Sequence, residues 1–320
     1  MGMLVDGVWQ TQNQFPTDAS GAFLRTATTF RDRVTADGSS GFRAESGRYH
    51  LYVSYACPWA HRTLIVRSLR GLQDAISVSV VDPLMGEDGW HFSDGPGCSP
   101  DPVHGAALLR EVYLAADPRF TGRITVPVLW DKKTGTIVNN ESTEIIRMLN
   151  TEFGVGLAAN PEVDFWPEGL REASDAVRDS IYERFNNGVY RAGFARAQGA
   201  YEHAVVEVFA VLDELEARLG ERRYLCSDTR IVEADICAFT TLLRFDPVYV
   251  GHFKCNLRRV VDHPNVWGYL RDLYQSPGVA QTCRMDHIKQ HYYRSHLSVN
   301  PSGVVPLGPE IDLQGPHGRG

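Results

Sequence analysis

The sequence has no second thiol beside Cys57: alanine stands at position 60, where a dithiol oxidoreductase of the Cys-x-x-Cys type has its second cysteine. Cysteine is sparse altogether, with 6 residues spread singly along a chain of 320. This spacing is unlike that of a small secreted disulfide scaffold, and it favours a reducing compartment.

The sequence also has no basic block and no long apolar run. Its 32 Lys and Arg residues against 39 Asp and Glu residues give a net charge of -7, which argues against nucleic acid or an anionic membrane as a partner. No apolar run approaches the ~18 residues of a transmembrane helix. Residues 1–6 show neither a basic and apolar leader nor the Ser or Thr of a myristoylation motif. We therefore expect a soluble, cytoplasmic protein.

Two domains are expected from the length and from the 43% hydrophobic content, which suffices for ordinary cores. Strand and helix patterns alternate over residues 46–155, and the first three predict a β-α-β unit with parallel strands. Residues 164–298 show only the helical spacing of apolar residues. The expected elements of the first domain are strand 50–55, helix 58–69, strand 75–81, a short helix at 106–114, strands 126–131 and 136–139, and a helix that Ser142 opens.

Three further segments complete the expected organisation. Residues 1–45 form an N-terminal arm that is polar, Gly-rich and weakly periodic. Residues 82–123, rich in Gly, Pro and Asp, form an insertion within the first domain. Residues 299–320 form a C-terminal tail that is expected to be extended or disordered. The predicted fold class is an α/β domain followed by an all-α domain.

Cys57 lies where the strand pattern changes to a helical one, and Pro58 fits the first helical turn because its missing N–H costs nothing there. The free N–H groups of a helix start can lower a thiol pKa from about 8.5 to roughly 3.5–7.5 and so produce the nucleophilic thiolate. Because no resolving thiol lies nearby, an external thiol such as glutathione must release any disulfide formed on Cys57. An inert buried cysteine is the alternative interpretation.

Two other loops are expected to meet Cys57 at one end of the sheet. Val126-Pro127 precedes a strand, at the position where thioredoxin-like domains have a cis-proline. Ser142 would cap the next helix, whose start could bind a carboxylate, while Glu141 could bind an ammonium group. A ligand with both charges at one end, such as the γ-glutamyl end of glutathione, fits this pair. A plain helix cap beside a solvated acid is the alternative.

A metal site is an alternative interpretation of the C-terminal part of the chain. Cys283, His287 and His291 recur every four residues, as on one helix face, and His296 follows them. The run contains no Glu that could act as a base and matches no closed four-ligand site. We therefore expect a solvated polar face and no metal.

Seven blocks of the sequence, from near the N-terminus to about Pro301, carry a family resemblance. They are Cys57-Pro58-Trp59-Ala60-His61-Arg62, Gly89-Trp90-His91-Phe92, Arg123 to Asp131, Asn140-Glu141-Ser142, Asn187 to Ala195, Arg244 to Tyr249, and His291-Tyr292-Tyr293. In this order they resemble the glutathione transferases, and specifically the Xi class, the glutathionyl-hydroquinone reductases. The resemblance implies a thioredoxin-like N-terminal domain, an all-helical glutathione-transferase C-terminal domain, and a homodimer.

The resemblance also implies roles for particular residues. Cys57 would be the nucleophile, and Tyr190 would give a proton to the leaving hydroquinone, as a phenol can without carrying charge. Tyr249 and Tyr292 would lie near the thiol, with Tyr293 as an alternative to Tyr292. Packing in a core is the alternative role of a helical tyrosine. Glutathione, the cosubstrate, would be held by Trp90, Arg123, Ile124, Thr125, Val126, Glu141 and Ser142.

The reaction that the resemblance implies is reduction of S-glutathionyl-hydroquinones by glutathione, through a mixed disulfide on Cys57. Aromatic glutathionyl conjugates would be the substrate class. Two alternatives remain open, because fold does not decide function. One is an omega-like thioltransferase or dehydroascorbate reductase, and the other is a non-catalytic glutathione-binding module.

The start of one helix departs from the family's pattern. Transferases of this fold have Ser or Thr three residues before an Asp there, whereas this chain has Val232 before Asp235. The missing side-chain cap would cost roughly 0.5–2 kcal/mol of stability, and we expect no effect on the chemistry.

Overall fold

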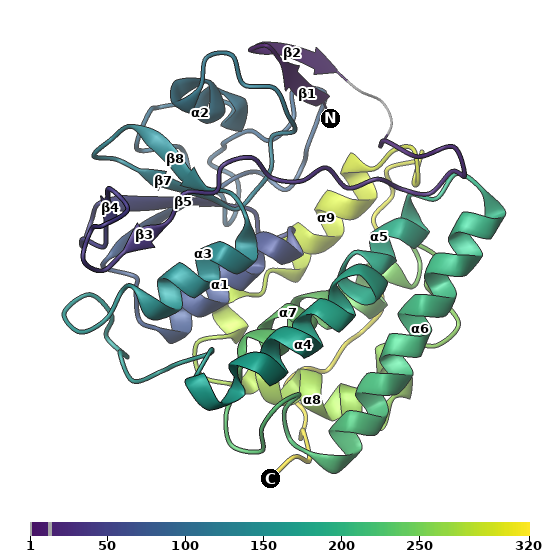
Figure 1. The fold of residues 1–320 in the computed structure, drawn as a ribbon. Coiled ribbons are helices and arrows are strands. Elements are labelled where there is room, and N and C mark those ends of the chain that lie inside the picture. The colour runs from purple at the N-terminus through teal and green to yellow at the C-terminus, as the bar shows by residue number, and fades with distance from the viewer. Residues whose placement is uncertain (1, 12–14) are drawn as a thin grey trace. The chain divides into compact units, whose positions relative to one another are not determined.

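The computed structural model describes residues 2–11 and 15–320. The chain divides into two compact units (Figure 1). Unit 1 consists of the described residues of 1–14 together with residues 26–163 and 282–295, and unit 2 consists of residues 15–25, 164–281 and 296–320. Neither unit is therefore one continuous segment of the chain.

Unit 1 is an α/β unit. Its elements are β1 (Gly2–Val5), β2 (Val8–Thr11), β3 (Val34–Thr35), β4 (Phe42–Arg43), β5 (Tyr49–Val53), α1 (Pro58–Leu69), β6 (Ile76–Val80), α2 (Leu109–Ala116), β7 (Val128–Asp131), β8 (Thr136–Asn139), α3 (Ser142–Thr151) and α9 (Met285–Ser295). The central sheet has the strand order β6-β5-β7-β8, in which β5 and β6 are parallel and the other two pairs are antiparallel. All of β5 is buried, and α1 and α3 lie side by side (Figure 1).

The elements of this sheet lie close to their predicted positions. The helix at 58–69 and the strand at 136–139 have the predicted bounds, and the other three strands agree within two residues at each end. Hydrophobic periodicity located them well because each strand and helix buries a face against the same core. The β-α-β unit followed by β-β-α is the arrangement that the sequence predicted.

A hairpin of β1 and β2 was not expected in the N-terminal arm, whose residues 1 and 12–14 lie outside the described part of the chain. Val5 pairs with Val8 across the turn Asp6-Gly7, where both turn residues have positive φ, 49° and 78°. Asp-Gly between apolar residues is a signal for this two-residue turn, so the hairpin was readable from the sequence. Glycine is also required for space, because a Cβ at Gly7 would lie 2.2 Å from a backbone oxygen of Pro118.

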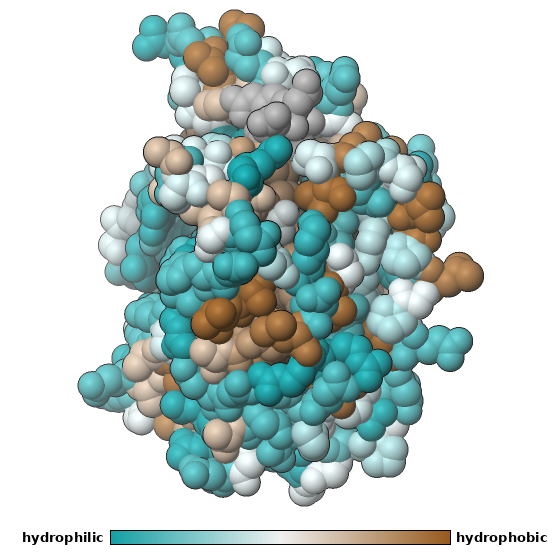
Figure 2. All heavy atoms as spheres, turned by 90° about the vertical axis from the view of Figure 1, so that its right-hand side faces the viewer, coloured by the Kyte–Doolittle hydropathy of each residue, from teal (hydrophilic) through white to brown (hydrophobic). Residues whose placement is uncertain are grey.

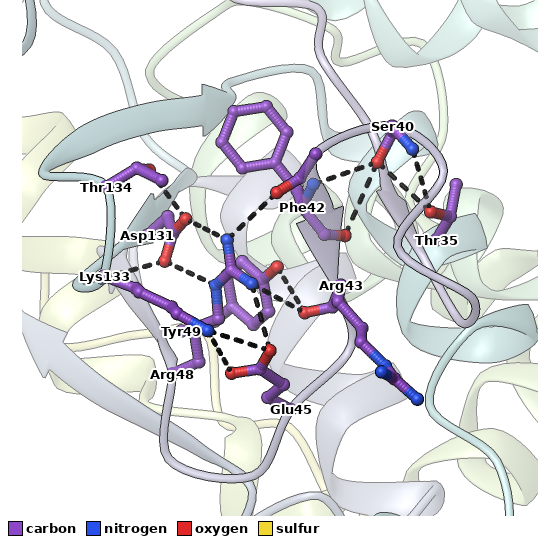
Figure 3. A network of polar contacts seen from close by, with 11 residues as sticks. Thr35, Ser40, Phe42, Arg43, Glu45, Arg48, Tyr49, Asp131, Lys133 and Thr134 are labelled. Atoms are coloured by element: carbon purple, nitrogen blue, oxygen red, sulfur yellow. Dashed lines mark hydrogen bonds and ion pairs between the residues drawn. The ribbon is translucent and has the colours of Figure 1, made fainter.

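A buried ion pair joins Arg48, which precedes β5, to Asp131, the last residue of β7 (Figure 3). Arg48 donates from Nε and Nη2 to both carboxylate oxygens of Asp131, at 2.8 and 2.6 Å. Thr134 also donates to Asp131, at 2.6 Å, while Glu45 accepts from Arg48 and from Lys133. Burial alone would raise the pKa of Asp131, but the hydrogen bonds from Arg48 and Thr134 outweigh it and hold that pKa below its ordinary value.

Residues 282–295 pack in unit 1, although they follow the helices of unit 2 in the sequence. The predicted all-α domain extended over this segment to residue 298, so the observed division differs there. The His287 ring contacts the Pro96 carbonyl oxygen through Nε2 at 2.7 Å, and the His291 ring contacts the Pro83 carbonyl oxygen through Nδ1 at 2.8 Å. The regularly spaced histidines of α9 are therefore buried anchors on the insertion.

The named secondary-structure elements of unit 2 are all helical, and they lie between residues 164 and 282. Unit 2 contains α4 (Arg171–Ile181), α5 (Gly188–Gly193), α6 (Gln198–Glu221), α7 (Glu233–Arg244) and α8 (Pro264–Gln275), with π-helical turns at Tyr182–Asn186 and Phe245–Tyr249 and short 3-10 turns at Glu168–Leu170 and Val260–Asp262. A further 3-10 turn, Ala280–Thr282, begins in unit 2 and ends at the first residue of the unit 1 segment 282–295. The pairs α4 and α7, α5 and α6, and α6 and α8 lie side by side. The predicted fold class, an α/β domain followed by an all-α domain, is confirmed.

Asp235 holds the start of α7, where Val232 offers no side-chain cap. Its carboxylate accepts hydrogen bonds from the backbone N–H groups of Val232 and Leu225, at 2.8 and 2.9 Å, and from the Tyr269 hydroxyl at 2.7 Å. Burial raises the pKa of Asp235 to about 6, against the lowering effect of these three donors.

The C-terminal tail was expected to be extended or disordered. It is extended, and it packs against the helices of unit 2. Gln275 of α8 donates to the Leu313 carbonyl at 2.9 Å, and Arg319 donates to the Leu219 carbonyl near the end of α6 at 2.9 Å. Gly268 leaves room for this packing, since a Cβ there would lie 2.6 Å from the His317 carbonyl oxygen. The tail therefore ties the end of α6 to α8.

The face that displays α6 is largely hydrophilic, with small hydrophobic patches (Figure 2). A surface groove of about 470 Å³ runs between α4 and α6. Its lining mixes apolar and charged side chains and includes none of the predicted site residues. Within the described part of the chain, no helix has the length and apolar character needed to cross a membrane.

Candidate active site

Cys57 is the N-cap of α1. Its backbone is extended, with φ −76° and ψ 121°, and its Sγ accepts a hydrogen bond from the Ala60 N–H at 3.5 Å. On its other side the thiol donates to the Val126 carbonyl oxygen at 3.4 Å. The side chain is half-buried. A sulfur at a helix start, facing a backbone N–H, is in a position that stabilises a thiolate.

Residues 123–126 bring a second loop to the thiol. The Val126-Pro127 peptide bond is cis, as expected. The Tyr113 hydroxyl of α2 donates to the Thr125 carbonyl oxygen at 2.9 Å and lies 3.3 Å from the Thr125 N–H, which donates to it. Tyr113 is fully buried, and burial raises its pKa. This phenol therefore fixes the backbone of the loop next to Cys57.

Glu141 and Ser142 open α3, but not in the predicted manner. Glu141 is the N-cap, and its Oε1 accepts from the Thr143 N–H at 3.2 Å, whereas Ser142 is the first helical residue. The Ser142 hydroxyl accepts from Arg62 Nη1 at 3.3 Å, and both side chains are buried. The prediction of Ser142 as the cap was wrong because an acidic side chain one residue earlier can also reach a free N–H of the first turn.

Trp90 and Tyr292 both contact the ring of one histidine, His291. The Trp90 ring stacks on the His291 ring, with centroids 4.8 Å apart and planes 19° apart. Tyr292 meets the same imidazole edge-on at 5.4 Å. Tyr292 is 1% exposed, while Tyr293 is half-buried. Assignment of Tyr292 rather than Tyr293 to the site stays a prediction.

Tyr190 and Tyr249 both belong to unit 2. Tyr190 is in α5, which follows one π-helical turn, and Tyr249 ends the other. Their ring centroids are 6.0 Å apart, and the Phe253 ring lies 5.3 Å from Tyr190 and 5.5 Å from Tyr249. π-Helical turns occur frequently at functional sites. The two phenols therefore share one aromatic cluster.

The predicted site residues thus form two sets. Unit 1 contains Cys57, Trp90, Arg123, Ile124, Thr125, Val126, Glu141, Ser142 and Tyr292, and unit 2 contains Tyr190 and Tyr249. Within the unit 1 set, Cys57 contacts Val126 and Glu141 contacts Ser142. Trp90 and Tyr292 are connected through His291.

Three other cysteines provide a contrast to Cys57. Burial raises the pKa of Cys226 to about 11 and that of Cys255 to about 12, and it also raises the pKa of Cys98. These thiols stay protonated at neutral pH and are poor nucleophiles.

Sequence reasoning missed two residues that position the thiol's surroundings. Tyr113 counted only as an apolar residue of a short helix, and nothing in its spacing pointed to the loop at residues 123–126. Buried His61 of α1 contacts the Thr282 hydroxyl through Nε2 at 2.8 Å, which links α1 to the segment before α9. His61 appeared in the Cys57 block, and that block was the only signal for it.

The histidines considered as metal ligands do not converge. His287 and His291 contact backbone carbonyls, and His296 belongs to unit 2, where its Nδ1 lies 3.3 Å from His252 Nε2. Over residues 2–11 and 15–320, no group of three or more His, Cys, Asp or Glu side chains is arranged to hold a metal ion.

Two family models match the chain: "Glutathione S-transferase, N-terminal domain" over residues 56–152 and "Glutathione S-transferase, C-terminal domain" over residues 198–272. The chain is 53% identical to glutathionyl-hydroquinone reductase YqjG of Escherichia coli strain K12, covering 100% of this chain and 98% of the relative. It is 50% identical to glutathionyl-hydroquinone reductase PcpF of Sphingobium chlorophenolicum, covering 98% of each.

Solved structures agree with these relatives. The Xi class transferase from Natrialba magadii has a TM-score of 0.93 and 54% identity, covering 100% of this chain and 96% of that one. The glutathione-bound structure of YqjG has a TM-score of 0.91 and 51% identity, covering 99% of each chain. The chain therefore belongs to the glutathione S-transferase family, in its Xi-class branch of glutathionyl-hydroquinone reductases. The predicted family and enzyme class are confirmed.

Proposed function

We propose that this protein reduces S-glutathionyl-hydroquinones with glutathione, as the names of its relatives state for them. The observation that carries the proposal is the single thiol of Cys57, which accepts the Ala60 N–H at the start of α1. Ala60 stands where a resolving cysteine would otherwise be. A lone activated thiol needs an external thiol to finish its cycle, and glutathione fits that need.

In the first half-reaction, the Cys57 thiolate attacks the sulfur of the glutathionyl group. The bond between that sulfur and the aromatic carbon breaks, and its electron pair leaves with the carbon. Tyr190 donates the proton that completes the C–H bond of the hydroquinone. Cys57 is left as a mixed disulfide with glutathione, so glutathione is oxidised and the aromatic ring is reduced.

In the second half-reaction, the thiolate of a second glutathione attacks the mixed disulfide. Oxidised glutathione leaves, and the Cys57 thiolate is restored. The proton of this glutathione reprotonates Tyr190 through solvent. The sum is one aryl thioether and one glutathione converted to one hydroquinone and one glutathione disulfide.

The loops around Cys57 suit the binding of a peptide-like cosubstrate. The positive end of the α3 helix dipole attracts a carboxylate, and the Glu141 carboxylate attracts an ammonium group. We assign Trp90, Arg123, Ile124, Thr125, Val126, Glu141 and Ser142 to glutathione, and Tyr249 and Tyr292 to the surroundings of the reacting sulfur. The similar YqjG structure is glutathione-bound, which supports this assignment.

The decisive experiment is mass spectrometry of the intact protein after mixing with a glutathionyl-hydroquinone in the absence of free glutathione. We expect one glutathione to be added to Cys57 while free hydroquinone appears in the chromatogram. Cys57→Ser should show neither product, and Cys98→Ser should behave as wild type.

Two other outcomes would replace the proposal. If the protein takes up glutathione only from a mixed disulfide and never from the aryl thioether, it is a thioltransferase of the omega type. If it binds glutathione but forms no Cys57 adduct from either donor, it is a binding module.

We also propose a homodimer in the cytoplasm, with no metal, nucleic acid or membrane as a partner. Family analogy supports the dimer, and the sparse cysteines and net charge of -7 support the rest. Light scattering coupled to gel filtration should give twice the mass of the 320-residue chain. A mass of one chain would contradict the dimer.

A further inference from the structure

Residues 15–25 are the part of the N-terminal arm that packs in unit 2. The Phe15 ring stacks on the Phe194 ring, with centroids 3.8 Å apart and planes 28° apart. The Arg196 N–H donates to the Gly21 carbonyl oxygen at 2.9 Å. The arm is therefore anchored at two points next to the end of α5, the helix that contains Tyr190.

Arg25 reaches from this arm to Tyr190. Its guanidinium carbon lies 5.0 Å from the centroid of the Tyr190 ring and 5.5 Å from that of Phe23. Its Nε donates to Asn187 Oδ1 at 2.6 Å. Asn187 is 3% exposed, and its amide nitrogen donates to the Glu183 carboxylate at 3.2 and 3.1 Å. Asn187 therefore holds the Arg25 guanidinium over the Tyr190 ring, and Glu183 in turn fixes the Asn187 amide.

We propose that Arg25 is a positioning residue for Tyr190: it holds the phenol ring in place and stabilises the negative charge that develops as the phenol loses its proton. The proposal rests on the proposed function, in which Tyr190 protonates the leaving carbon. A cation over an aromatic face is attracted by the ring's electron density, and that density grows as the oxygen becomes negative. The contact is therefore stronger in the transition state, which is the condition for raising kcat.

The exposure of Arg25 and Tyr190 to water sets how strongly Arg25 can change the rate. Tyr190 is 8% exposed, but Arg25 is an exposed residue, so water weakens the cation's field. A contact of this kind should change the rate by about three- to tenfold. The effect should be confined to the step in which carbon leaves, because thiol-disulfide exchange on Cys57 needs no proton from Tyr190.

The test compares Arg25→Met and Arg25→Lys with the control Arg171→Met. Arg171 is an exposed arginine of unit 2 whose guanidinium carbon lies 4.5 Å from the Trp166 ring and whose Nε donates to a backbone carbonyl. We expect Arg25→Met to lower kcat for the aryl thioether about three- to tenfold with little change in KM. Arg25→Lys should recover most of the loss. Disulfide exchange, and both reactions of Arg171→Met, should match wild type.

A second comparison separates a positioning role from a general structural one. In the Tyr190→Phe background, Arg25→Met should lower the rate no further, because the hydroxyl through which Arg25 acts is gone. An equal loss in both backgrounds, or an equal loss in disulfide exchange, would overturn the inference.

Failure of the proposed function can be distinguished from failure of this inference. If the wild-type protein does not cleave the aryl thioether, the proposed function is wrong, and NMR of ring-labelled tyrosine then judges the contact alone. We expect the Tyr190 ring signals to move in Arg25→Met and to stay in place in Arg171→Met. Unmoved signals in Arg25→Met would show that the guanidinium does not position the ring.

Discussion

Each unit buries one carboxylate completely, and the two are stabilised in opposite ways. In unit 1, Asp131 faces the guanidinium of Arg48 in a two-point ion pair. In unit 2, Asp235 accepts two backbone N–H groups and the Tyr269 hydroxyl, and none of these donors carries a charge. The pKa of Asp131 lies below its ordinary value, and burial raises that of Asp235 to about 6.

The two sites show how far neutral hydrogen-bond donors can stabilise a buried charge. Asp235 accepts three hydrogen bonds from neutral donors, yet these do not fully offset the loss of hydration that its charge suffers. For Asp131, the hydrogen bonds and the charge of Arg48, together with hydrogen bonds from the Thr134 hydroxyl and the Lys133 N–H, more than offset that loss.

The two units also differ in their roles in the proposed chemistry. Unit 1 contains the thiol and the loops assigned to glutathione, which both thiol exchange and thioether cleavage require. Unit 2 contains Tyr190, the proposed proton donor, which only thioether cleavage requires. Substitutions in the two units should therefore separate the two reactions.

The largest expected effect comes from removing the thiol of unit 1. Cys57→Ser should lower kcat on the order of 10³-fold or more, since the nucleophile of both reactions is lost. Steady-state assays with an aryl thioether and with a glutathione mixed disulfide measure the two losses. Turnover retained with either substrate would remove Cys57 from that reaction.

The next effect tests the ion pair of unit 1. Arg48→Met leaves the Asp131 charge buried without its cation and should lower the free energy of unfolding by about 3–5 kcal/mol, as urea denaturation measures. Arg31→Met, which removes an exposed ion pair with Glu144, should cost less than about 1 kcal/mol. Similar losses of unfolding free energy in the two variants would mean that the buried Arg48–Asp131 pair matters no more to stability than the exposed pair does.

A smaller effect separates the reactions of the two units. Tyr190→Phe should slow aryl thioether cleavage about 10²-fold, because the proton donor is lost, and should leave glutathione mixed-disulfide exchange unchanged. Single-turnover assays of both reactions provide the comparison. An equal slowing of both would indicate that Tyr190 has only a packing role.

The smallest effect is the difference in pH dependence between the two carboxylates. Because the pKa of folded Asp235 is about 6 and its ordinary value is 3.8, the folded state binds the proton more tightly, and stability falls on the order of 2 kcal/mol as pH rises from about 4 to 6. For Asp131 the folded pKa is lowered, so its contribution is present above about pH 4 and is lost below it.

Urea denaturation between pH 3 and 7 measures both contributions. Asp235→Asn should lose less stability than wild type as pH rises from about 4 to 6. Asp131→Asn should lose less than wild type as pH falls below about 4. Parallel curves for either variant and wild type would contradict the corresponding pKa shift.

The elements of the central sheet were predictable because each one buries a face in a single core, so the apolar period is strong. The β1–β2 hairpin had a readable signal in Asp6-Gly7, but each of its strands is only 4 residues long, too short for a clear apolar period. The position of α9 had no such signal. Its histidines had the spacing of a helix face, and the sequence does not tell whether such a face meets water or carbonyl groups of a distant loop.

The site was predictable to different extents. Cys57 at a helix start followed from the strand-to-helix change and Pro58, both of which are local. The cap of α3 was misplaced by one residue, since Glu141 and Ser142 can each reach a first-turn N–H. Tyr113 could not be foreseen, because its hydroxyl meets a loop 12 residues away through packing that no local pattern encodes.

Four features follow from the amino-acid sequence alone: the β-α-β start, the helical second half, the single thiol at the first helix, and the family. The elements follow from the local period of apolar residues. The single thiol follows from Ala60, which stands in place of the second cysteine of a Cys-x-x-Cys motif, and the family follows from the order of the seven sequence blocks. Other features emerge only in the folded chain: α9 packs in unit 1, residues 15–25 and the tail pack in unit 2, and Arg25 lies over Tyr190. Such contacts join residues far apart in the chain, and they form where burial and hydrogen-bond satisfaction of the whole unit are best, which no short segment specifies.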